Sequence, residues 1–477
     1  MNEITTDRPP NVVLMNCDDL GYGDIGCYGS ALHQTPHLDR LAGEGMLFSD
    51  FYMASPVCSP SRAALLTGCY PARIGFGQFD GLPVLFPGHR YGLAPEEVTI
   101  ADLLSAAGYA TKLVGKWHCG DQQAFLPTRH GFTAYYGLPY SNDMGRQRLP
   151  EGSPSVAELL ARLGIELPVD EMPPLPLLHG EEVIEAQPDL ASLTERFVEE
   201  SIRFMRANAE RPFFLYLAHI YVHLPLYVQD RFIQESINGR YGAAVAAIDW
   251  AAGCLLAELE RLGLVDDTIV IFTSDNGSRA NGEGGSNLPL RGVKGSTWEG
   301  GMRVPFLARW PERIPAGTVS DAMVTAMDLL PTLAAIAGAR VSEERTIDGR
   351  DISPVLLGED GASPHEAFFY YSMDSLEAVR SGQWKLHLAR RGEPVDELYD
   401  LASDIGETTN LFDAHPEVVG RLSAHAERAR GELGDARLGI VGADTRPVGR
   451  VDHPVTLTTF DPEHPYYVAE YDLPDRG

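Results

Sequence analysis

Basic residues are scarce in this sequence, and its start lacks the signals for export or membrane insertion. Lys and Arg number 38 against 67 Asp and Glu, which gives a formal net charge of −29. Because such a surface repels nucleic acid and anionic membranes, neither is expected as a partner. Residues 1–10 contain no basic start followed by an apolar run, and no stretch has the roughly 18 apolar residues that cross a bilayer. We therefore expect a soluble, cytoplasmic protein, with earlier removal of a leader as the alternative.

Cysteine is also scarce, with six positions scattered along the chain and no Cys-x-x-Cys pair. This excludes a disulfide-rich scaffold and argues against a thiolate metal site. Free Cys is among the residue types most often buried, so most of the six are expected to be small core residues. The six are Cys17, Cys27, Cys58, Cys69, Cys119 and Cys254.

The sequence does contain apolar, β-rich runs that alternate with helical patterns. Four runs are typical of strands buried on both faces, at residues 11–16, 212–217, 268–273 and 305–310. Three helices are predicted from apolar residues at three- and four-residue spacing, over residues 99–107, 192–207 and 241–262. The alternation predicts an α/β fold with a large, mostly parallel central sheet flanked by helices.

The texture of the sequence changes near residue 364. Shorter and more polar strands follow, then an amphipathic helix at about 416–433 and a Pro-rich tail that could wrap a neighbouring chain in a homo-oligomer. The chain also exceeds the length that a single core usually serves. We therefore predict a larger α/β domain over 1–363 and a smaller α+β domain with a small antiparallel sheet over 364–477. Residues 149–190, rich in Pro and acids, are predicted to form a long excursion near the mouth of the site.

Two predicted strands run into oxygen-bearing side chains. The first leads into Asp18 and Asp19, and a later one leads into Asp275 and Asn276. Open α/β sheets bind ligands at the carboxyl ends of their strands, and carboxylate and amide oxygens suit a hard cation such as Ca²⁺. An Asp-rich turn explains the first pair equally well on its own. The two pairs together favour a metal site that keeps positions open for water and substrate.

A cysteine and an arginine lie together at the predicted start of a helix. The Pro-Ser pair that follows Cys58 can open this helix, whose first turn would present Cys58 and Arg62 at the end that favours anions. Positions 51–79 contain no acidic residue, yet Arg62 and Arg73 both lie there. In so acidic a chain this pattern predicts local anion binding, although a buried cysteine before an ordinary helix also fits it.

The run CSPSRAALLTG, residues 58–68, resembles the signature CxPSRxxLLTG of the type I, formylglycine-dependent sulfatases. The resemblance extends along nearly the whole chain through DDLGYGD, TPHLDRLAGEG, GKWHCG, TSDNG, LRGVKGSTWEGGMRVP and ELYDLASDIGETTNL. The chain looks most similar to the arylsulfatase A and N-acetylgalactosamine-6-sulfatase branch of the alkaline phosphatase superfamily. The resemblance implies an alkaline phosphatase-like fold and a sulfuric ester hydrolase that converts a small-molecule or sugar sulfate monoester into an alcohol or phenol and inorganic sulfate.

The resemblance also implies a modified residue and a metal. A formylglycine-generating enzyme would convert Cys58 into formylglycine (3-oxoalanine) before folding is complete. One hydroxyl of the hydrated aldehyde would attack sulfur to give a covalent sulfo-enzyme, and deprotonation of the second would expel sulfate. The metal would be Ca²⁺, with Mg²⁺ as the alternative. By similarity its ligands would be Asp18, Asp19, Cys58 in its modified form, Asp275 and Asn276.

The remaining site residues are also implied by the resemblance. His118 would deprotonate the second hydroxyl, while Arg62 would hold the diol and the anionic cluster in place. His223 would protonate the leaving oxygen, because the Pro two residues later matches a His-x-Pro pattern of the family. His219 is the competing assignment for that role.

Three further side chains would contact the substrate. Lys116 and Lys294 would bind sulfate oxygens and offset the charge that builds up during transfer. Ser141 resembles a substrate-contacting serine of the arylsulfatase A branch, and the next residue, Asn142, departs from the histidine expected there.

Two other functions stay open from the sequence. A phosphomonoesterase or phosphonate monoester hydrolase of the same superfamily would act on a similar anion, although the chain lacks the His-rich second metal set of the alkaline phosphatases. A catalytically silent protein that binds sulfated ligands is the other alternative. Such a protein would be expected to have lost Cys58, Lys116 or a metal ligand.

Overall fold

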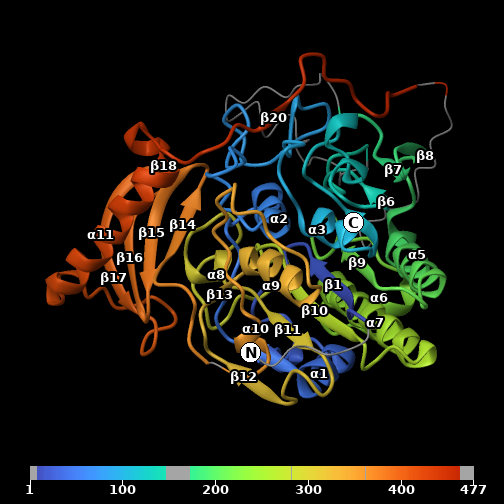
Figure 1. Ribbon diagram of the computed structural model, residues 1–477, viewed down its shortest axis with the longest axis horizontal. Coiled ribbons are helices and arrows are strands. Elements are labelled where there is room, and N and C mark those ends of the chain that lie inside the picture. Colours follow the sequence, from blue (N-terminus) through green and yellow to red (C-terminus); the bar gives the residue numbers. More distant parts are fainter. Residues whose placement is uncertain (1–7, 147–171, 281, 360, 462, 464–477) are drawn as a thin grey trace.

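The chain forms a larger body around a central sheet, with a smaller sheet and one long helix beside it (Figure 1). The computed structural model describes residues 8–146, 172–280, 282–359, 361–461 and 463 of the 477. The predicted α/β fold, alkaline phosphatase-like and with a smaller C-terminal α+β part, is confirmed.

In the described part of the chain, ten strands form the central sheet in the order β12-β2-β11-β10-β1-β9-β5-β6-β7-β8. The inner strands β10, β1, β9, β5 and β6 are parallel, whereas β11 on one side and β7 and β8 on the other run antiparallel to their neighbours. The sheet is therefore parallel where it is most deeply buried. In chain order the strands are β1 (Asn11–Cys17), β2 (Met46–Phe48), β5 (Ala110–Lys116), β6 (Ala134–Leu138), β7 (Pro176–His179), β8 (Glu182–Ala186), β9 (Phe213–Ala218), β10 (Thr268–Ser274), β11 (Phe306–Arg309) and β12 (Thr318–Ser320).

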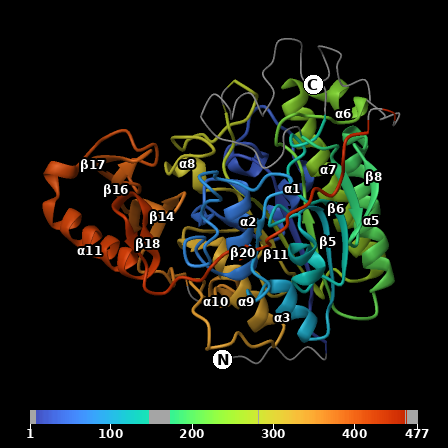
Figure 2. The same ribbon diagram turned by 90° about the horizontal axis from the view of Figure 1, so that it is seen from above.

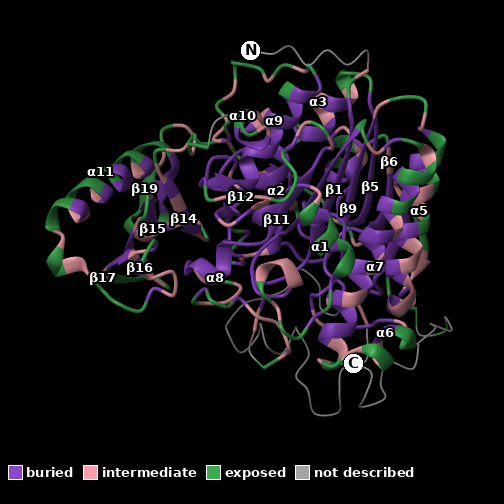
Figure 3. Ribbon diagram, turned by 90° about the horizontal axis from the view of Figure 1, so that it is seen from below, coloured by how far each residue is buried: buried purple, intermediate pink, exposed green. Residues whose placement is uncertain are grey.

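Helices cover both faces of this sheet, as Figure 3 shows by the buried strands between half-exposed helices. Alternate side chains of β1 point to opposite faces, with Val13 and Met15 toward one helix layer and Val12 and Leu14 toward the other. The first layer contains α1 (Pro36–Gly43), α5 (Leu193–Ala207), α6 (Asp230–Glu235) and α7 (Gly239–Leu262). The second contains α2 (Cys58–Thr67), α3 (Ile100–Ala106), α9 (Leu329–Ile336) and α10 (Ser353–Leu356). Because both faces are covered, the inner strands can be apolar throughout.

Helix α7 corrects one expectation from the sequence. By length and composition it is apolar enough to cross a membrane, although no such stretch was predicted. Most of its apolar window is buried inside the structure, where the helix packs on α1, α5 and α6. A buried helix in the core of a soluble protein can be as long and as apolar as α7. The length and composition of α7 are therefore only weak evidence for a membrane span. Gly263, in the left-handed conformation at φ 68°, ends the helix.

A four-stranded antiparallel sheet and a long helix form the smaller body. Helix α11 (Pro416–Leu433) packs against β15 and β16. The strands are β14 (Phe368–Ser372), β15 (Ser375–Ser381), β16 (Trp384–Arg390) and β17 (Glu393–Asp400). A domain boundary between residues 363 and 364 stays a prediction.

After α11 the chain returns to the larger body along a path that we call the C-terminal strap, residues 442–460 (Figure 2). Its short strand β20 (Gly449–Arg450) pairs antiparallel with β4 (Tyr91–Gly92), and Val455 exchanges two hydrogen bonds with the Gln122 side chain. The described part of the predicted Pro-rich tail therefore packs on its own chain. Of the predicted excursion at residues 149–190, positions 147–171 lie outside the described residues, and 176–186 supply β7 and β8.

The remaining short elements connect these parts. Strands β3 and β13 form one two-stranded pair, and strands β18 and β19 form another that follows α11. Their bounds are β3 (Phe51–Tyr52), α8 (Glu299–Met302), β13 (Val324–Thr325), β18 (Gly434–Asp435) and β19 (Ile440–Val441).

Candidate active site

Four neighbouring parallel strands, β10, β1, β9 and β5, end at one edge of the central sheet, and each leads into polar side chains. The strands themselves are buried along their whole length, so the chain first meets polar partners where they stop. This edge is where open α/β sheets place their ligands. Strand β10 leads into Asp275 and Asn276, β1 into Asp18 and Asp19, β9 into the loop of His219 and His223, and β5 ends at Lys116 and leads into His118.

The acidic side chains that were predicted to bind a metal lie together at this edge. Asp18, Asp19 and Asp275 each offer a carboxylate oxygen within 4.8 Å of the others. Asn276 Nδ2 donates to Asp19 Oδ1 at 2.7 Å, which fixes the orientation of the amide. All four residues are buried. Burial and the charge of Asp18 raise the pKa of Asp275 to about 6, as expected where like charges share a desolvated site.

Two oxygens in this group fit a cation. Among the residues that the structure describes, Asp18 Oδ1 and Asn276 Oδ1 are buried without a hydrogen-bond donor. A buried polar atom without a partner is costly, and each such atom in a folded chain calls for an explanation. Both atoms are oxygen acceptors beside two further carboxylates, which is the donor set that Ca²⁺ or Mg²⁺ uses. The residues present therefore fit a divalent cation.

Three basic side chains are directed at the carboxylates. Lys116 Nζ lies 2.6 Å from Asp18 Oδ2, and Lys294 Nζ lies 2.7 Å from Asp19 Oδ1. Burial alone would raise the pKa of Asp18, but the neighbouring charges, Lys116 first among them, hold it well below its usual value.

Arg62 is the third of these basic groups. It is fully buried, and its Nε and NH2 lie 2.8 and 2.7 Å from Asp275 Oδ2. A second contact joins it to the end of β5, because its NH1 donates to the Lys116 carbonyl at 3.0 Å. Arg62 therefore connects the β10 and β5 ends of the site.

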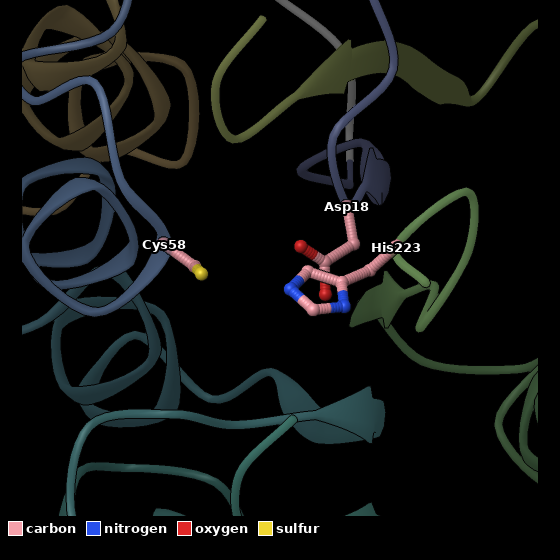
Figure 4. Close-up of side chains that lie close together, drawn as sticks. All are labelled: Asp18, Cys58 and His223. Carbon is pink, nitrogen blue, oxygen red and sulfur yellow. The ribbon is translucent and has the colours of Figure 1, made fainter. Parts of the chain in front are cut away.

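Cys58 is the first residue of α2, two residues earlier than the predicted helix start at the Pro-Ser pair. The thiol is buried, and burial raises its pKa. Figure 4 shows Cys58 directed toward Asp18 and His223, and the three ligand atoms lie within 4.8 Å of one another. The helix is held against β10 by Ser61, whose hydroxyl donates to the Asp275 carbonyl at 2.5 Å.

The histidines of the site differ in their surroundings. His118 Nε2 donates to the Leu85 carbonyl at 3.0 Å, so Nδ1 is the atom left to accept a proton. Burial, together with the charge of Lys116, holds the pKa of His118 well below its usual value. His223 Nδ1 likewise donates to the Leu224 carbonyl at 2.6 Å, and its Nε2 lies 3.9 Å from Asp19 Oδ2.

His219 lies apart from this group. It is fully buried, and burial lowers its pKa to about 4. Its backbone continues the sheet by donating to the Asn16 carbonyl at 2.9 Å. The structure therefore brings His223 to Cys58 and Asp18, and gives His219 a place in the core.

The predicted wall of the pocket lies next to Lys116. The Ser141 hydroxyl is buried and accepts a hydrogen bond from Lys116 Nζ at 2.6 Å. Asn142, the position that departs from the expected histidine, donates to the Pro225 carbonyl at 3.0 Å. That bond ties the wall to the loop of His223.

One residue that the sequence did not single out supports the loop after β1. Asp24 accepts hydrogen bonds from Gly21 N, Ser286 N and the Tyr241 hydroxyl, all at 2.6–2.7 Å, and burial raises its pKa to about 7. It therefore joins the loop after β1 to the loop after β10. The signal was present, because Asp24 ends the run DDLGYGD, but two of its three partners, Tyr241 and Ser286, are more than 200 positions away.

Comparisons with known families and proteins agree with one another. The family model described as sulfatase matches residues 10–339, and the model of the C-terminal part of N-sulphoglucosamine sulphohydrolase matches residues 294–430. Arylsulfatase A of Homo sapiens is 40% identical over 456 residues, covering 87% of this chain and 86% of the relative. N-acetylgalactosamine-6-sulfatase of Canis lupus familiaris is 42% identical over 394 residues, covering 80% and 72%. Steryl-sulfatase of Mus musculus is 36% identical over 518 residues, covering 89% and 83%.

Solved structures give the same result for the fold. The crystal structure titled Ps i-CgsB superposes with a TM-score of 0.77 at 32% identity, covering 91% of this chain and 96% of that one. The PsFucS1 sulfatase from Pseudoalteromonas sp. superposes with a TM-score of 0.77 at 28% identity, covering 89% and 91%.

The comparisons overturn the expected location. Arylsulfatase A, N-acetylgalactosamine-6-sulfatase and steryl-sulfatase are enzymes of the lysosome or of the endoplasmic reticulum membrane. The prediction of a cytoplasmic protein is therefore wrong. The prediction rested on the composition of residues 1–10. That composition does not report where the relatives of the folded chain act.

Proposed function

The chain belongs to the sulfatase family and is a sulfuric ester hydrolase, and from this premise we propose that residue 58 and the charged groups around it cleave a sulfate monoester. Members of the family use a formylglycine residue and a divalent metal, and sulfatase relatives act on sulfated small molecules or sugars. One observation carries the assignment to this site. The Cys58 thiol lies beside a cluster in which Asp18 Oδ1 and Asn276 Oδ1 have no donor within the described chain, so a cation and an anion both have a place there.

We propose that the metal is Ca²⁺, held by Asp18, Asp19, Asp275, Asn276 and the modified residue 58. Calcium accepts a flexible set of about six to eight oxygens, whereas Mg²⁺ requires a stricter octahedron. When bound, the cation polarises a sulfate oxygen and makes a neighbouring hydroxyl more acidic.

The two lysines are proposed to hold the sulfate group. Lys116 and Lys294 already hold their ammonium groups on Asp18 and Asp19, so they need little reorganisation when an anion enters. The Ser141 hydroxyl orients Lys116 by accepting a hydrogen bond from its Nζ at 2.6 Å. Burial makes these contacts stronger than they would be in water.

Two histidines are proposed to move protons in opposite directions. His118 Nε2 donates its proton to the Leu85 carbonyl, and the lowered pKa of His118 keeps the ring neutral. His118 Nδ1 can therefore take a proton from residue 58. His223 is directed at Cys58 and Asp18, and its Nδ1 already donates to a backbone carbonyl. Its Nε2, which lies 3.9 Å from the Asp19 carboxylate, is therefore the atom that would donate a proton to the leaving oxygen.

We also propose that a formylglycine-generating enzyme acts on Cys58 before α2 packs. In the folded chain Cys58 is 2% exposed, and every residue of α2 is buried. A modifying enzyme has no access to such a side chain, so the conversion belongs to an unfolded or partly folded stage.

The proposal is tested by peptide mass spectrometry across residue 58, combined with hydrolysis of p-nitrophenyl sulfate and p-nitrophenyl phosphate with and without a calcium chelator. We expect a mass about 18 Da below the cysteine form and sulfate release that the chelator abolishes and Ca²⁺ restores. Cys58→Ala is the control and should release no sulfate. An unmodified Cys58 in protein that cleaves the phosphate ester faster would contradict the proposal.

A further inference from the structure

Lys294 lies on a loop that is held from two sides. We call residues 290–298 the lysine loop. On the side of the larger body, Lys294 N donates to the Ser278 carbonyl at 3.0 Å and Gly295 N donates to the Pro56 carbonyl at 2.9 Å. These bonds tie the loop to the segments that follow β10 and precede Cys58.

The smaller body holds the opposite side of the same loop. From β16, Lys385 Nζ donates to the Thr297 carbonyl at 2.9 Å, and from β15, Glu377 accepts the Thr297 hydroxyl at 2.7 Å. Glu407 accepts the Glu299 amide at 2.8 Å through its side chain. The backbone at both Thr297 and Glu299 therefore depends on side chains of the C-terminal part.

Buried ion pairs hold the lysine loop on this side. Lys385 Nζ lies 2.9 Å from Glu299 Oε1 and 3.0 Å from Glu407 Oε1, and all three side chains are fully buried. Burial alone would raise the pKa of Glu299, but Lys385 and two neighbouring arginines hold it well below its usual value. Buried charges are stable only while they stay paired. Removal of Lys385 would leave two carboxylates close together without their shared cation.

An aromatic side chain completes the attachment. Trp298, the last residue of the lysine loop, is stacked between the guanidinium groups of Arg291 and Arg390, at 3.8 and 4.1 Å from the ring centroid. The His387 ring lies 4.5 Å away. Arg390 and His387 both belong to β16, so this strand contacts the loop through a packed ring as well as through charge.

From these contacts we propose that Lys385 is a positioning residue for sulfate ester hydrolysis: shared between Glu299 and Glu407, it fixes the lysine loop and thereby the Lys294 ammonium at Asp19. The inference rests on the role proposed above for Lys294. It makes the C-terminal sheet a working part of the active site, which reaches Lys294 through the backbone of one loop.

The test is a double-mutant cycle with Lys294→Ala, Lys385→Met and the double variant, assayed with p-nitrophenyl sulfate at a temperature where all are folded. Lys294→Ala should lower kcat/KM by about 100- to 1000-fold, as for loss of one donor to a transition-state anion. Lys385→Met should lower it by about 10- to 100-fold and weaken inhibition by inorganic sulfate. In the double variant Lys385→Met should cost no more than about twofold beyond Lys294→Ala, because it acts through Lys294.

Lys112 provides the matched control. It is also a buried lysine, paired with Glu200 at 2.8 Å, but it lies within β5 and contacts α5 instead of the lysine loop. Lys112→Met should lower the melting temperature while leaving kcat/KM and sulfate inhibition within about twofold of the wild type. Should Lys385→Met fail to fold, Thr297→Val tests the hold of the smaller body on the lysine loop, because it removes only the hydroxyl that donates to Glu377.

The outcomes separate the two proposals. Wild-type turnover in Lys294→Ala would remove the proposed role of Lys294 itself. A strong loss in Lys294→Ala, together with full activity in Lys385→Met and Thr297→Val, would overturn only the positioning role. Independent, multiplying losses in the double variant would also overturn it, since they would mean that Lys385 acts on overall stability.

Discussion

At the scale of the residue, the positive and negative side chains of the site nearly cancel one another's charge. Three cationic side chains face three carboxylates, and all six are buried except Lys294, whose side chain is 15% exposed, so the cluster is close to neutral in a chain of net charge −29. A divalent cation would then give the pocket a positive field that attracts an anionic ester. The six side chains are Asp18, Asp19, Arg62, Lys116, Asp275 and Lys294.

A second buried carboxyl should make stability depend on pH. Asp121 accepts hydrogen bonds from Gly88 N at 2.7 Å and Gln122 Nε2 at 2.8 Å, but burial raises its pKa to about 7. An unfolded Asp titrates near pH 4, roughly, so between about pH 4 and 7 the folded chain holds a proton that the unfolded chain has lost. The free energy of unfolding should therefore fall as the pH rises through this window, by about 1.4 kcal/mol per unit of pKa difference at most.

Denaturant unfolding of Asp121→Asn at several pH values checks this. The variant cannot ionise, so its stability relative to the wild type should increase from pH 4 to pH 7, whatever constant offset the lost hydrogen bond adds. A flat difference for Asp121→Asn would contradict the pKa assigned to Asp121.

The sequence predicted which residues form the site better than it predicted how they touch. Cys58 and Arg62 are near one another in one motif, and the strand-end pairs are adjacent in sequence. The bonds between these groups are not local, because Arg62 and Asp275 are 213 positions apart and Lys116 and Asp18 are 98 apart. Such contacts depend on strand order, which apolar periodicity does not encode.

At the scale of the element, β5 was missed, whereas β1, β9 and β10 of the same parallel group were predicted. Its sequence, ATKLVGK, contains two lysines and a glycine that weaken a strand pattern. The structure explains both lysines and the glycine. Lys112 pairs with Glu200, Lys116 faces the candidate active site, and Gly115 adopts φ 107° against the Ala218 carbonyl of β9.

Gly115→Ala should therefore damage both the fold and the site. A Cβ at this position would lie 1.8 Å from the Ala218 carbonyl oxygen, and the positive φ adds strain to any side chain. We expect a loss of at least about 3 kcal/mol in the free energy of unfolding, together with lower turnover because Lys116 follows directly. Gly431→Ala, on the exposed face of α11 with open space around it, should be neutral or stabilising by up to about 1 kcal/mol. Similar stabilities for the two variants, measured by denaturant unfolding, would contradict this account.

At the scale of the whole molecule, the two bodies are joined twice. The lysine loop and the C-terminal sheet share the buried charges of Glu299, Lys385 and Glu407, and the C-terminal strap returns to the far side of the larger body (Figure 2). Neither connection was predicted, because each pairs residues that local patterns treat as separate. The predicted order of a large sheet followed by a small one is nevertheless confirmed.

The strap is expected to contribute to stability through one arginine. Arg446 lies 2.7 and 3.0 Å from the two oxygens of Glu97, which is 4% exposed, and its NH1 donates to the Thr346 carbonyl at 3.1 Å. Arg446→Ala leaves Glu97 buried with a weaker partner and should cost about 3 kcal/mol. Arg203 is exposed and paired with Glu199 on α5, so Arg203→Ala should lower the free energy of unfolding by less than about 1 kcal/mol. Equal losses in denaturant unfolding of the two variants would show that the strap adds little.

The same strap sets an order in time during synthesis. Val455 and the Gln122 side chain to which it bonds are 333 positions apart, so at about 5–20 residues per second the ribosome needs on the order of tens of seconds to deliver the second after the first. Throughout that interval β4 lacks its partner strand and Glu97 lacks Arg446. The larger body of the growing chain therefore lacks these contacts during a period in which the segment around Cys58 has already left the ribosome. The delay falls in the period in which the modifying enzyme proposed above would act on Cys58.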